Sequence, residues 1–381
     1  MIWETKLINE LYKIKGGKRL PKGTLLQASL NNHPYIRITD MVEGRVIELT
    51  NKFMYVPLNV AASISSYKVQ KDDLILSIVG QIGNINIIGK TLDEANLTEN
   101  CVKFIPFNDN IDTAFIYYYL SSEQGQEQIE QRIVGSTQPK LPIYNIQTIE
   151  IPFPPLIEQK AIASVLSCLD DKIALLHRQS KTLEEMAETL FYQWFIEIAK
   201  KEEWKQGVLE HLVDLKYGKA LKQEDRSGSG YPVVASSGIV GFHKDYLVEG
   251  PGIVIGRKGT LGKVYFMEDS FYPIDTSYFI KTKIPRSNMI FEYYLLKSLD
   301  FVNMNSDSAV PGLNRNIALG TAIQIPPLER VYDFNRLVKP WLCKIQKNTK
   351  QIKTLEKLRD TLLPKLMSGE VRVEYKKVDA A

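Results

Sequence analysis

The chain of 381 residues contains little cysteine, little histidine and no long apolar run. Its three cysteines, Cys101, Cys168 and Cys343, lie far apart and form no Cys-x-x-Cys pair, which favours a reducing compartment over a disulfide framework. The four histidines show no metal-ligand spacing with these cysteines, so no metal site is predicted. Because no apolar run approaches the ~18 residues of a membrane span, we expect a cytoplasmic protein with no membrane partner.

The sequence also lacks a strong excess of charge of one sign. Lysine and arginine number 48 against 44 acidic residues, which gives a formal net charge of +4. The chain as a whole is therefore not a polycation, and any surface for nucleic acid must be local or shared with another subunit. Its length allows two or three domains, each with its own core.

No set of residues assembles an acid–base pair, an activated nucleophile or a cofactor loop. Two glycine turns, at Gly80–Gly83 and Gly259–Gly262, are followed by strand-like residues, so hairpins are favoured over phosphate loops, which open a helix. Asn32-His33-Pro34-Tyr35 only partly matches the Asn-Pro-Pro-Tyr signature of adenine methyltransferases, and no glycine-rich cofactor loop precedes it. We therefore predict no catalytic residue and no cofactor in this chain.

A long helical stretch from Pro154 to Lys200 dominates the sequence, and it returns 172 positions later from Pro326. In both copies, residues at alternating steps of four and three form a heptad seam that packs against a partner helix. In the first copy the seam comprises Ile162, Leu166, Leu169, Ile173, Leu176, Ser180, Leu183, Ala187, Leu190 and Trp194. In the second it comprises Phe334, Val338, Trp341, Ile345, Asn348, Ile352, Leu355, Arg359, Leu362 and Leu366.

The regions that precede the two helices also correspond. Strand-like Leu74–Val79 runs into Gly80 and Gly83, and Ile253–Ile255 runs into Gly259 and Gly262. We therefore predict an α+β fold with two similar strand-rich domains, separated by a pair of long antiparallel coiled-coil helices in a pseudo-two-fold repeat. The predicted segments are a first domain at 1–153, a helix at 154–200, a second domain at 201–325, a helix at 326–368 and a tail at 369–381. Within the first domain the pattern predicts one helix over 114–133. Pro340 and Pro364 predict a kink or a local end in the second long helix.

Basic loops recur near the start of both domains, and they are candidates for binding phosphates. Polar residues that differ between the domains are candidates for reading bases, because arginine and lysine suit guanine whereas asparagine and glutamine suit adenine. Two related domains with different reading residues would recognise two different half-sites. The candidates are Lys15, Lys18, Arg19, Lys22, Gln138 and Lys140 in the first domain and Lys219, Lys222, Arg257, Lys258, Asn314, Arg315 and Asn316 in the second.

With these features together, the chain resembles the specificity subunit of a type I restriction–modification enzyme over nearly its whole length. The resemblance rests on the order domain, helix, domain, helix and on three stretches of sequence. These are Ile151-Pro152-Phe153-Pro154-Pro155-Leu156-Ile157-Glu158-Gln159, Leu190-Phe191-Tyr192-Gln193-Trp194-Phe195 and Leu362-Leu363-Pro364-Lys365-Leu366-Met367-Ser368-Gly369-Glu370. The second helix begins Leu328-Glu329-Arg330 and so lacks the Glu-Gln pair of the first.

The resemblance implies a non-catalytic subunit whose two recognition domains each read one half of an asymmetric site in double-stranded DNA. It also implies that two modification (methyltransferase) subunits dock on the helices and that restriction subunits join them. S-adenosylmethionine and ATP would belong to those partners. Two alternatives stay open: a coiled-coil adaptor that presents two protein-binding domains, which salt-dependent DNA binding would exclude, and a fused methyltransferase–nuclease, which would itself bind S-adenosylmethionine.

Overall fold

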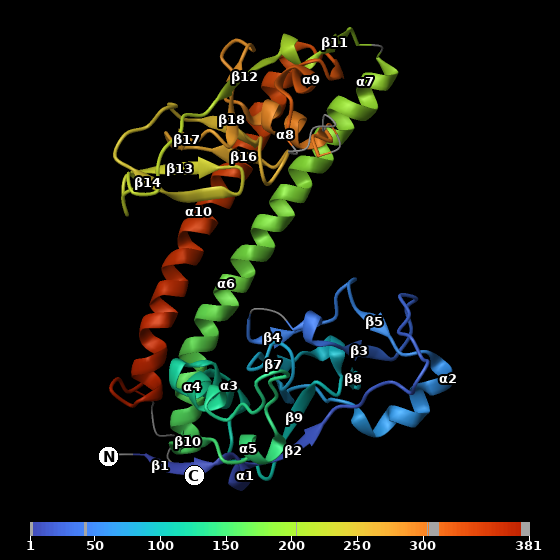
Figure 1. Cartoon of the computed structure of the whole chain (residues 1–381), viewed down its shortest axis with the longest axis vertical. Helices are drawn as coiled ribbons and strands as arrows, with labels where there is room; N and C mark the ends of the chain where they lie inside the picture. The colour runs from blue at the N-terminus through green and yellow to red at the C-terminus, as the bar shows by residue number, and fades with distance from the viewer. Residues whose placement is uncertain (1–2, 42–43, 203, 303, 305–311, 375–381) are drawn as a thin grey trace, which may run out of the picture. The chain divides into compact units, whose positions relative to one another are not determined.

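The computed structural model describes residues 3–41, 44–202, 204–302, 304 and 312–374. The chain forms two compact units, and each contains one globular domain together with part of both long helices (Figure 1). The first unit runs to Leu176 and resumes at Gln351, and the second runs from His177 to Lys350. The sequence analysis assigned the domains and the helices to separate segments, whereas each compact unit contains one domain and part of both helices.

Within its described residues, the first domain contains three sheets with short helices between their strands. A five-stranded sheet has the order β2-β9-β6-β7-β4, a three-stranded sheet has the order β5-β3-β8, and β1 pairs with β10. The strands are β1 Glu4–Leu7, β2 Tyr12–Gly16, β3 Pro34–Ile36, β4 Val46–Ile47, β5 Met54–Tyr55, β6 Leu74–Ser77, β7 Ile85–Ile88, β8 Asn96–Leu97, β9 Cys101–Pro106 and β10 Glu150–Phe153. The helices are α1 Ile8–Leu11, α2 Leu58–Ala61, α3 Thr113–Ser121, α4 Glu123–Glu130 and α5 Ile143–Ile146.

The second domain repeats this topology. Its sheets have the orders β12-β18-β15-β16, β14-β13-β17 and β11-β19, and the strand β13 is antiparallel to β14 and parallel to β17, just as β3 is to β5 and β8. The strands are β11 Gln206–Val208, β12 Val213–Tyr217, β13 Tyr231–Ala235, β14 Gly238–His243, β15 Gly252–Gly256, β16 Val264–Met267, β17 Tyr272–Pro273, β18 Ser277–Thr282 and β19 Ala322–Gln324. The helices are α8 Ile290–Ser298 and α9 Arg315–Leu319. The shared order confirms the predicted internal repeat.

The two long helices lie where the heptad seam predicted them. Helix α6 spans Leu156–Phe191 and continues through a π-helical segment, Tyr192–Glu197, into α7, Ile198–Lys201. Helix α10 spans Leu328–Met367, so neither Pro340 nor Pro364, where a kink or a local end was predicted, ends it. Both prolines are exposed, so water can satisfy the carbonyl oxygen that each leaves without an amide partner.

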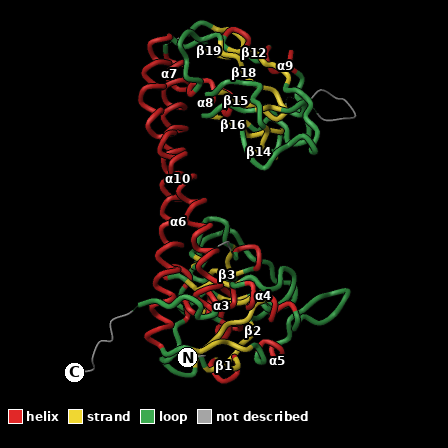
Figure 2. Tube along the Cα trace, turned by 90° about the vertical axis from the view of Figure 1, so that its left-hand side faces the viewer, coloured by secondary structure: helices red, strands yellow, loops and turns green. Residues whose placement is uncertain are grey.

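The two long helices lie side by side (Figure 2), and their contacts pair rising residue numbers on α6 with falling numbers on α10, so they run antiparallel, as predicted. In the first unit, Ile173 and Leu176 of α6 share a buried cluster with Ile352 and Leu355 of α10. In the second, the buried Asn348 donates hydrogen bonds to Ser180 Oγ (3.1 Å) and Gln179 Oε1 (3.0 Å). A polar layer of this kind fixes the register of a coiled coil, because a shift would leave its buried amide among apolar groups.

Other predicted seam residues differ in burial. Leu190, Trp194, Trp341 and Ile345 are partly buried against the core of the second unit, and Leu362 is partly buried against that of the first. Leu169 and Leu183 are half-buried.

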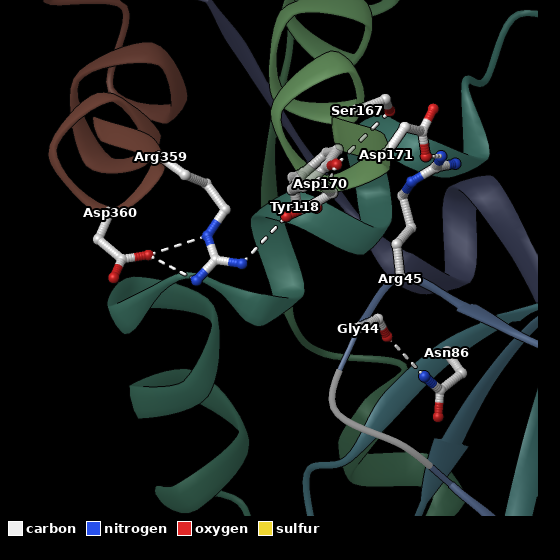
Figure 3. Close-up of polar contacts among 9 residues, drawn as sticks. All are labelled: Gly44, Arg45, Asn86, Tyr118, Ser167, Asp170, Asp171, Arg359 and Asp360. Atoms are coloured by element: carbon white, nitrogen blue, oxygen red, sulfur yellow. Dashed lines mark hydrogen bonds and ion pairs between the residues drawn. The ribbon is translucent and has the colours of Figure 1, made fainter. Parts of the chain in front are cut away.

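An ionic cluster fixes the first domain to the helices (Figure 3). The Tyr118 hydroxyl of α3 donates to Asp170 Oδ2 (2.6 Å), and Arg359 of α10 donates to the other carboxylate oxygen (3.0 Å). Beside them, Arg45 forms an ion pair with Asp171 (2.8 Å). Burial, together with the hydrogen bond to Asp170, raises the pKa of Tyr118, so the phenol stays a donor. The ion pair with Asp170 of α6 therefore explains why a charged residue, Arg359, occupies a seam position.

The sequence pattern predicted a single helix over 114–133, but the structure has two helices there. Helix α3 ends at Ser121 and α4 starts at Glu123. Ser122 has an extended backbone, and its hydroxyl accepts a hydrogen bond from the Gly125 amide. Serine caps helices in this way, so the second helix begins at its own N-cap.

At each junction between a domain and its long helix, a tryptophan, a carboxylate and an arginine lie in contact. The helix supplies the carboxylate in the first unit and the arginine in the second. In the first unit, Trp3 Nε1 donates to Glu158 (3.3 Å) at the start of α6, and Arg372 lies 3.8 Å from that carboxylate. In the second unit the helix supplies the cation. Its Arg330 lies over the Trp204 ring, whose Nε1 donates to Glu202.

The buried Gln159 makes its contact within the first unit, because its side-chain oxygen accepts a hydrogen bond from the Asp112 backbone amide (2.9 Å). The Glu-Gln pair of the first helix therefore stabilises its own junction.

Candidate nucleic-acid interface

In the first domain, the turn between β6 and β7 is hydrogen-bonded to the loop before α5. The Leu141 amide donates to the Ile78 carbonyl (2.9 Å), and Val79 forms an isolated β-bridge with Lys140. Gln138 lies in the same loop, which two backbone hydrogen bonds between Val134 and Lys140 close. Both Gln138 and Lys140 are exposed. The structure therefore brings the glycine turn and this candidate reading loop together.

The second domain makes the same contact with different side chains. The Leu313 amide donates to the Arg257 carbonyl (3.0 Å), and Lys258 forms an isolated β-bridge with Gly312. The two glycines of each turn have a positive φ, as the sequence match implies: 77° and 96° in the first domain, 78° and 68° in the second. Both turns join antiparallel strands, which confirms the predicted hairpins. Each domain thus presents a paired-loop site, with Ile78-Val79 in one and Arg257-Lys258 in the other.

A glycine–lysine pair at the start of each basic loop was missed in the sequence analysis. The backbone amides of Gly17 and Lys18 donate to carbonyls of β9 and β8, and those of Gly218 and Lys219 donate in the same way to carbonyls of β18 and β17. An ideal Cβ would lie 2.0 Å from a backbone oxygen at Gly17 and 2.2 Å at Gly218, so both positions require glycine. The signal was a shared offset of 201 residues, which also relates Trp3 to Trp204.

Three cations of the first basic loop have partners within the domain. Lys15 and Lys18 lie over the Tyr67 ring, with Nζ 5.9 and 5.6 Å from its centroid. Arg19 is ion-paired with Glu99 (2.6 Å), although its side chain is largely exposed. The other candidates of the basic loops, Lys22, Lys219 and Lys222, are exposed. Contact of these loops with DNA stays a prediction.

Two candidates in the second domain make contacts that stabilise its fold. The Arg315 guanidinium forms an ion pair with Asp214 (2.6 Å) and donates to the Leu215 carbonyl (2.7 Å). Lys216 and Arg315 hold the pKa of Asp214 below its usual range, with Lys216 as the larger cause. Asn314 is the N-cap of α9, and its side chain accepts from two backbone amides, whereas Asn316 is exposed. Base reading by these residues stays a prediction.

We expect the variant Arg315→Ala to lower the free energy of unfolding of the second unit. Arg315 joins α9 to β12 through charge-assisted bonds, but its side chain is one-third exposed, so the expected loss is about 1–2 kcal/mol. Denaturant unfolding of the full chain measures this loss. Asn316→Ala, at the exposed neighbour, is the control and should leave stability within about 0.5 kcal/mol. Unchanged stability with loss of one half-site would instead make Arg315 a base-reading residue.

Comparisons with known proteins bear on this repeated site. A family model described as "Type I restriction modification DNA specificity domain" matches residues 2–185 and again residues 201–361. The chain belongs to this family. The MjaIX type I restriction enzyme specificity subunit of Methanocaldococcus jannaschii is 26% identical, covering 98% of this chain and 94% of its own. The MjaVIII specificity subunit of the same organism is 23% identical and covers 98% and 93%.

The fold is that of a solved family member. The crystal structure of the type I restriction–modification S subunit from M. genitalium aligns with a TM-score of 0.71 at 21% identity, covering 96% of both chains. The two family matches coincide with the two copies of the repeat, and each includes one globular domain and most of the helix that follows. This specificity chain therefore carries two DNA specificity domains. None of its helices, within the described residues, is long and apolar enough to cross a membrane.

Proposed function

We propose that the chain is the DNA-recognition subunit of a type I restriction–modification complex and that its two domains read different halves of a bipartite, asymmetric site. The observation that supports this most is the repeated paired-loop site. The backbone contacts are the same in both domains, yet apolar Ile78 and Val79 stand where the second domain has Arg257 and Lys258. Two scaffolds with one geometry and different side chains would present different chemistry to two base sequences.

In this proposal the helices set the spacing of the half-sites and dock two modification subunits, and restriction subunits join that assembly. Exposed apolar side chains on both helices support docking. Leu175 and Met186 of α6 and Leu337 and Leu358 of α10 are each 44–50% exposed. A modification subunit docked on the helices would bury these side chains. The chain supplies recognition without catalysis, and the partners bind S-adenosylmethionine and ATP.

Methylation mapping in cells that carry this chain and its modification subunits tests the proposal. We expect methylated adenines or cytosines within one bipartite sequence that has two specified halves and an unspecified spacer of fixed length. Methylation at a continuous site, or at sites that persist when the chain is deleted, would contradict the proposal. Binding of S-adenosylmethionine by the isolated chain, measured by calorimetry, would show that it is itself a methyltransferase.

A further inference from the structure

Arg257 is held against two aromatic rings at the paired-loop site of the second domain. Its guanidinium carbon lies 4.8 Å from the centroid of the Tyr217 ring and 5.7 Å from that of the Tyr278 ring. One guanidinium nitrogen donates to the Asp275 carbonyl (3.2 Å), and the backbone amide donates to the Thr276 carbonyl. Both ends of the residue are thus fixed before any ligand arrives.

The charge of Arg257 is not neutralised within the described residues, where no carboxylate oxygen lies within 4.0 Å of its guanidinium. Arg19 and Arg315 differ, because each has a carboxylate at 2.6 Å. Arginine has five N–H donors in a planar fork, and the carbonyl of Asp275 occupies only part of it. Arg257 therefore combines a fixed position with donors that an acceptor from outside the chain can use.

Tyr217 contacts this guanidinium although the residue is 52% exposed. Cation–π contact with a stacked ring restricts the guanidinium plane, which lowers the entropy cost of a bidentate hydrogen bond. The Tyr217 ring lies 5.0 Å from the Tyr278 ring, which is buried and supports it from the sheet. The exposed Tyr217 is thus held between the buried Tyr278 ring and the Arg257 guanidinium.

The corresponding row of the first domain has no aromatic side chain. Across β12, β18 and β15 the row consists of Tyr217, Tyr278 and Ile255. Across β2, β9 and β6 it consists of Gly16, Val102 and Leu76. In the turn that follows, Arg257 has Ile78 as its counterpart. The oriented guanidinium therefore distinguishes the second domain from the first.

We propose that Arg257 is a specificity-determining residue that reads a guanine in the half-site of the second domain and that Tyr217 is its positioning residue. Guanine presents two acceptors, O6 and N7, on its major-groove edge, and a planar guanidinium can contact both at once. This inference rests on the proposed function, since it requires the second domain to read a base sequence.

Selection from a library of DNA duplexes with randomised base pairs tests the inference, with the full chain assembled with its modification subunits. The unaltered assembly should select one bipartite sequence with a guanine in the half-site of the second domain. If the unaltered assembly selected no sequence, the proposed function itself would fail, whatever the variants did. Selection of a half-site without guanine would overturn only the role of Arg257.

In the Arg257→Ala and Arg257→Lys variants, preference for that guanine should fall about 10- to 100-fold. Lysine keeps the charge but loses the planar fork, so it should not restore the preference. All other positions should be unchanged. Arg286→Ala removes an equal charge from an exposed residue beyond the opposite end of β18 and should leave base preference intact. A phosphate contact predicts equal weakening on every duplex and a salt-dependence slope lower by about one, which would overturn the inference.

Tyr217 is tested by replacing its ring. Tyr217→Leu should lower the preference for the same guanine about 3- to 10-fold, because about 1 kcal/mol of cation–π contact is lost. Tyr217→Phe keeps the ring face and should retain the preference. The control Tyr246→Leu changes another half-exposed tyrosine, which lies against Tyr231, and should have no effect. If Tyr217→Leu and Tyr217→Phe behaved alike, the ring would have no positioning role.

Discussion

Replacing Phe334 by alanine should destabilise the second unit by about 3–5 kcal/mol, the usual cost of removing a buried phenylalanine ring. Phe334 is 0% exposed and lies at the centre of an aromatic cluster. Its ring centroid is 5.3–6.4 Å from those of Phe191, Trp194, Phe195 and Tyr294. These residues come from α6, the π-helical segment and α8, so one side chain joins the long helices to the second domain.

Denaturant unfolding of the full chain, followed by tryptophan fluorescence, measures the effect. Trp194, Trp204 and Trp341 belong to the second unit and Trp3 to the first, so two transitions are expected once the second unit is weakened. Leu337→Ala, at a half-exposed position on the same helix, is the matched control and should cost less than about 1 kcal/mol. A loss below about 1 kcal/mol for Phe334→Ala would show that the cluster does not hold the second domain on its helices.

The helices were predictable because the heptad spacing is a local signal. The repeat was predictable because the two halves of one sequence can be compared with each other. A heptad seam requires only the spacing of apolar residues along one helix, and the second copy confirms the register of the first. Neither proline ends the second helix, because the cost of the lost backbone hydrogen bond depends on exposure, which the spacing does not contain. The π-helical geometry of Tyr192–Glu197 was not predictable, because the helical pattern of the sequence continues through this segment without a break.

The candidate charges were found from the sequence, but their partners were not. Arg315 and Asp214 are 101 residues apart, and Arg19 and Glu99 are 80 apart. Whether an arginine is neutralised depends on the order of strands in the sheet, such as β12-β18-β15-β16, and this order is non-local. For the same reason Arg257 was one candidate among thirteen until the row of Tyr217 and Tyr278 was known.

Lengthening both long helices by four residues should lengthen the spacer of the recognised DNA sequence while leaving its two halves unchanged. The insertions belong after Leu176 in α6 and after Lys350 in α10, where the two compact units meet in sequence. The packing of Ile173 with Ile352 and the hydrogen bond between Asn348 and Ser180 then each stay within one unit. The proposal that the helices set the spacing is tested without disturbing either domain.

Four residues add about 6 Å and leave a rotation of about 40°, given 1.5 Å per residue and 3.6 residues per turn. Because DNA rises about 3.4 Å per base pair, we expect the spacer to grow by about two base pairs. Methylation-site sequencing in cells that carry the variant and its modification subunits measures the change. Insertion of two residues at each place is the control: it rotates the helices by about 200° and should abolish methylation at both half-sites. An active four-residue variant with the original spacer would show that the helices do not set the distance.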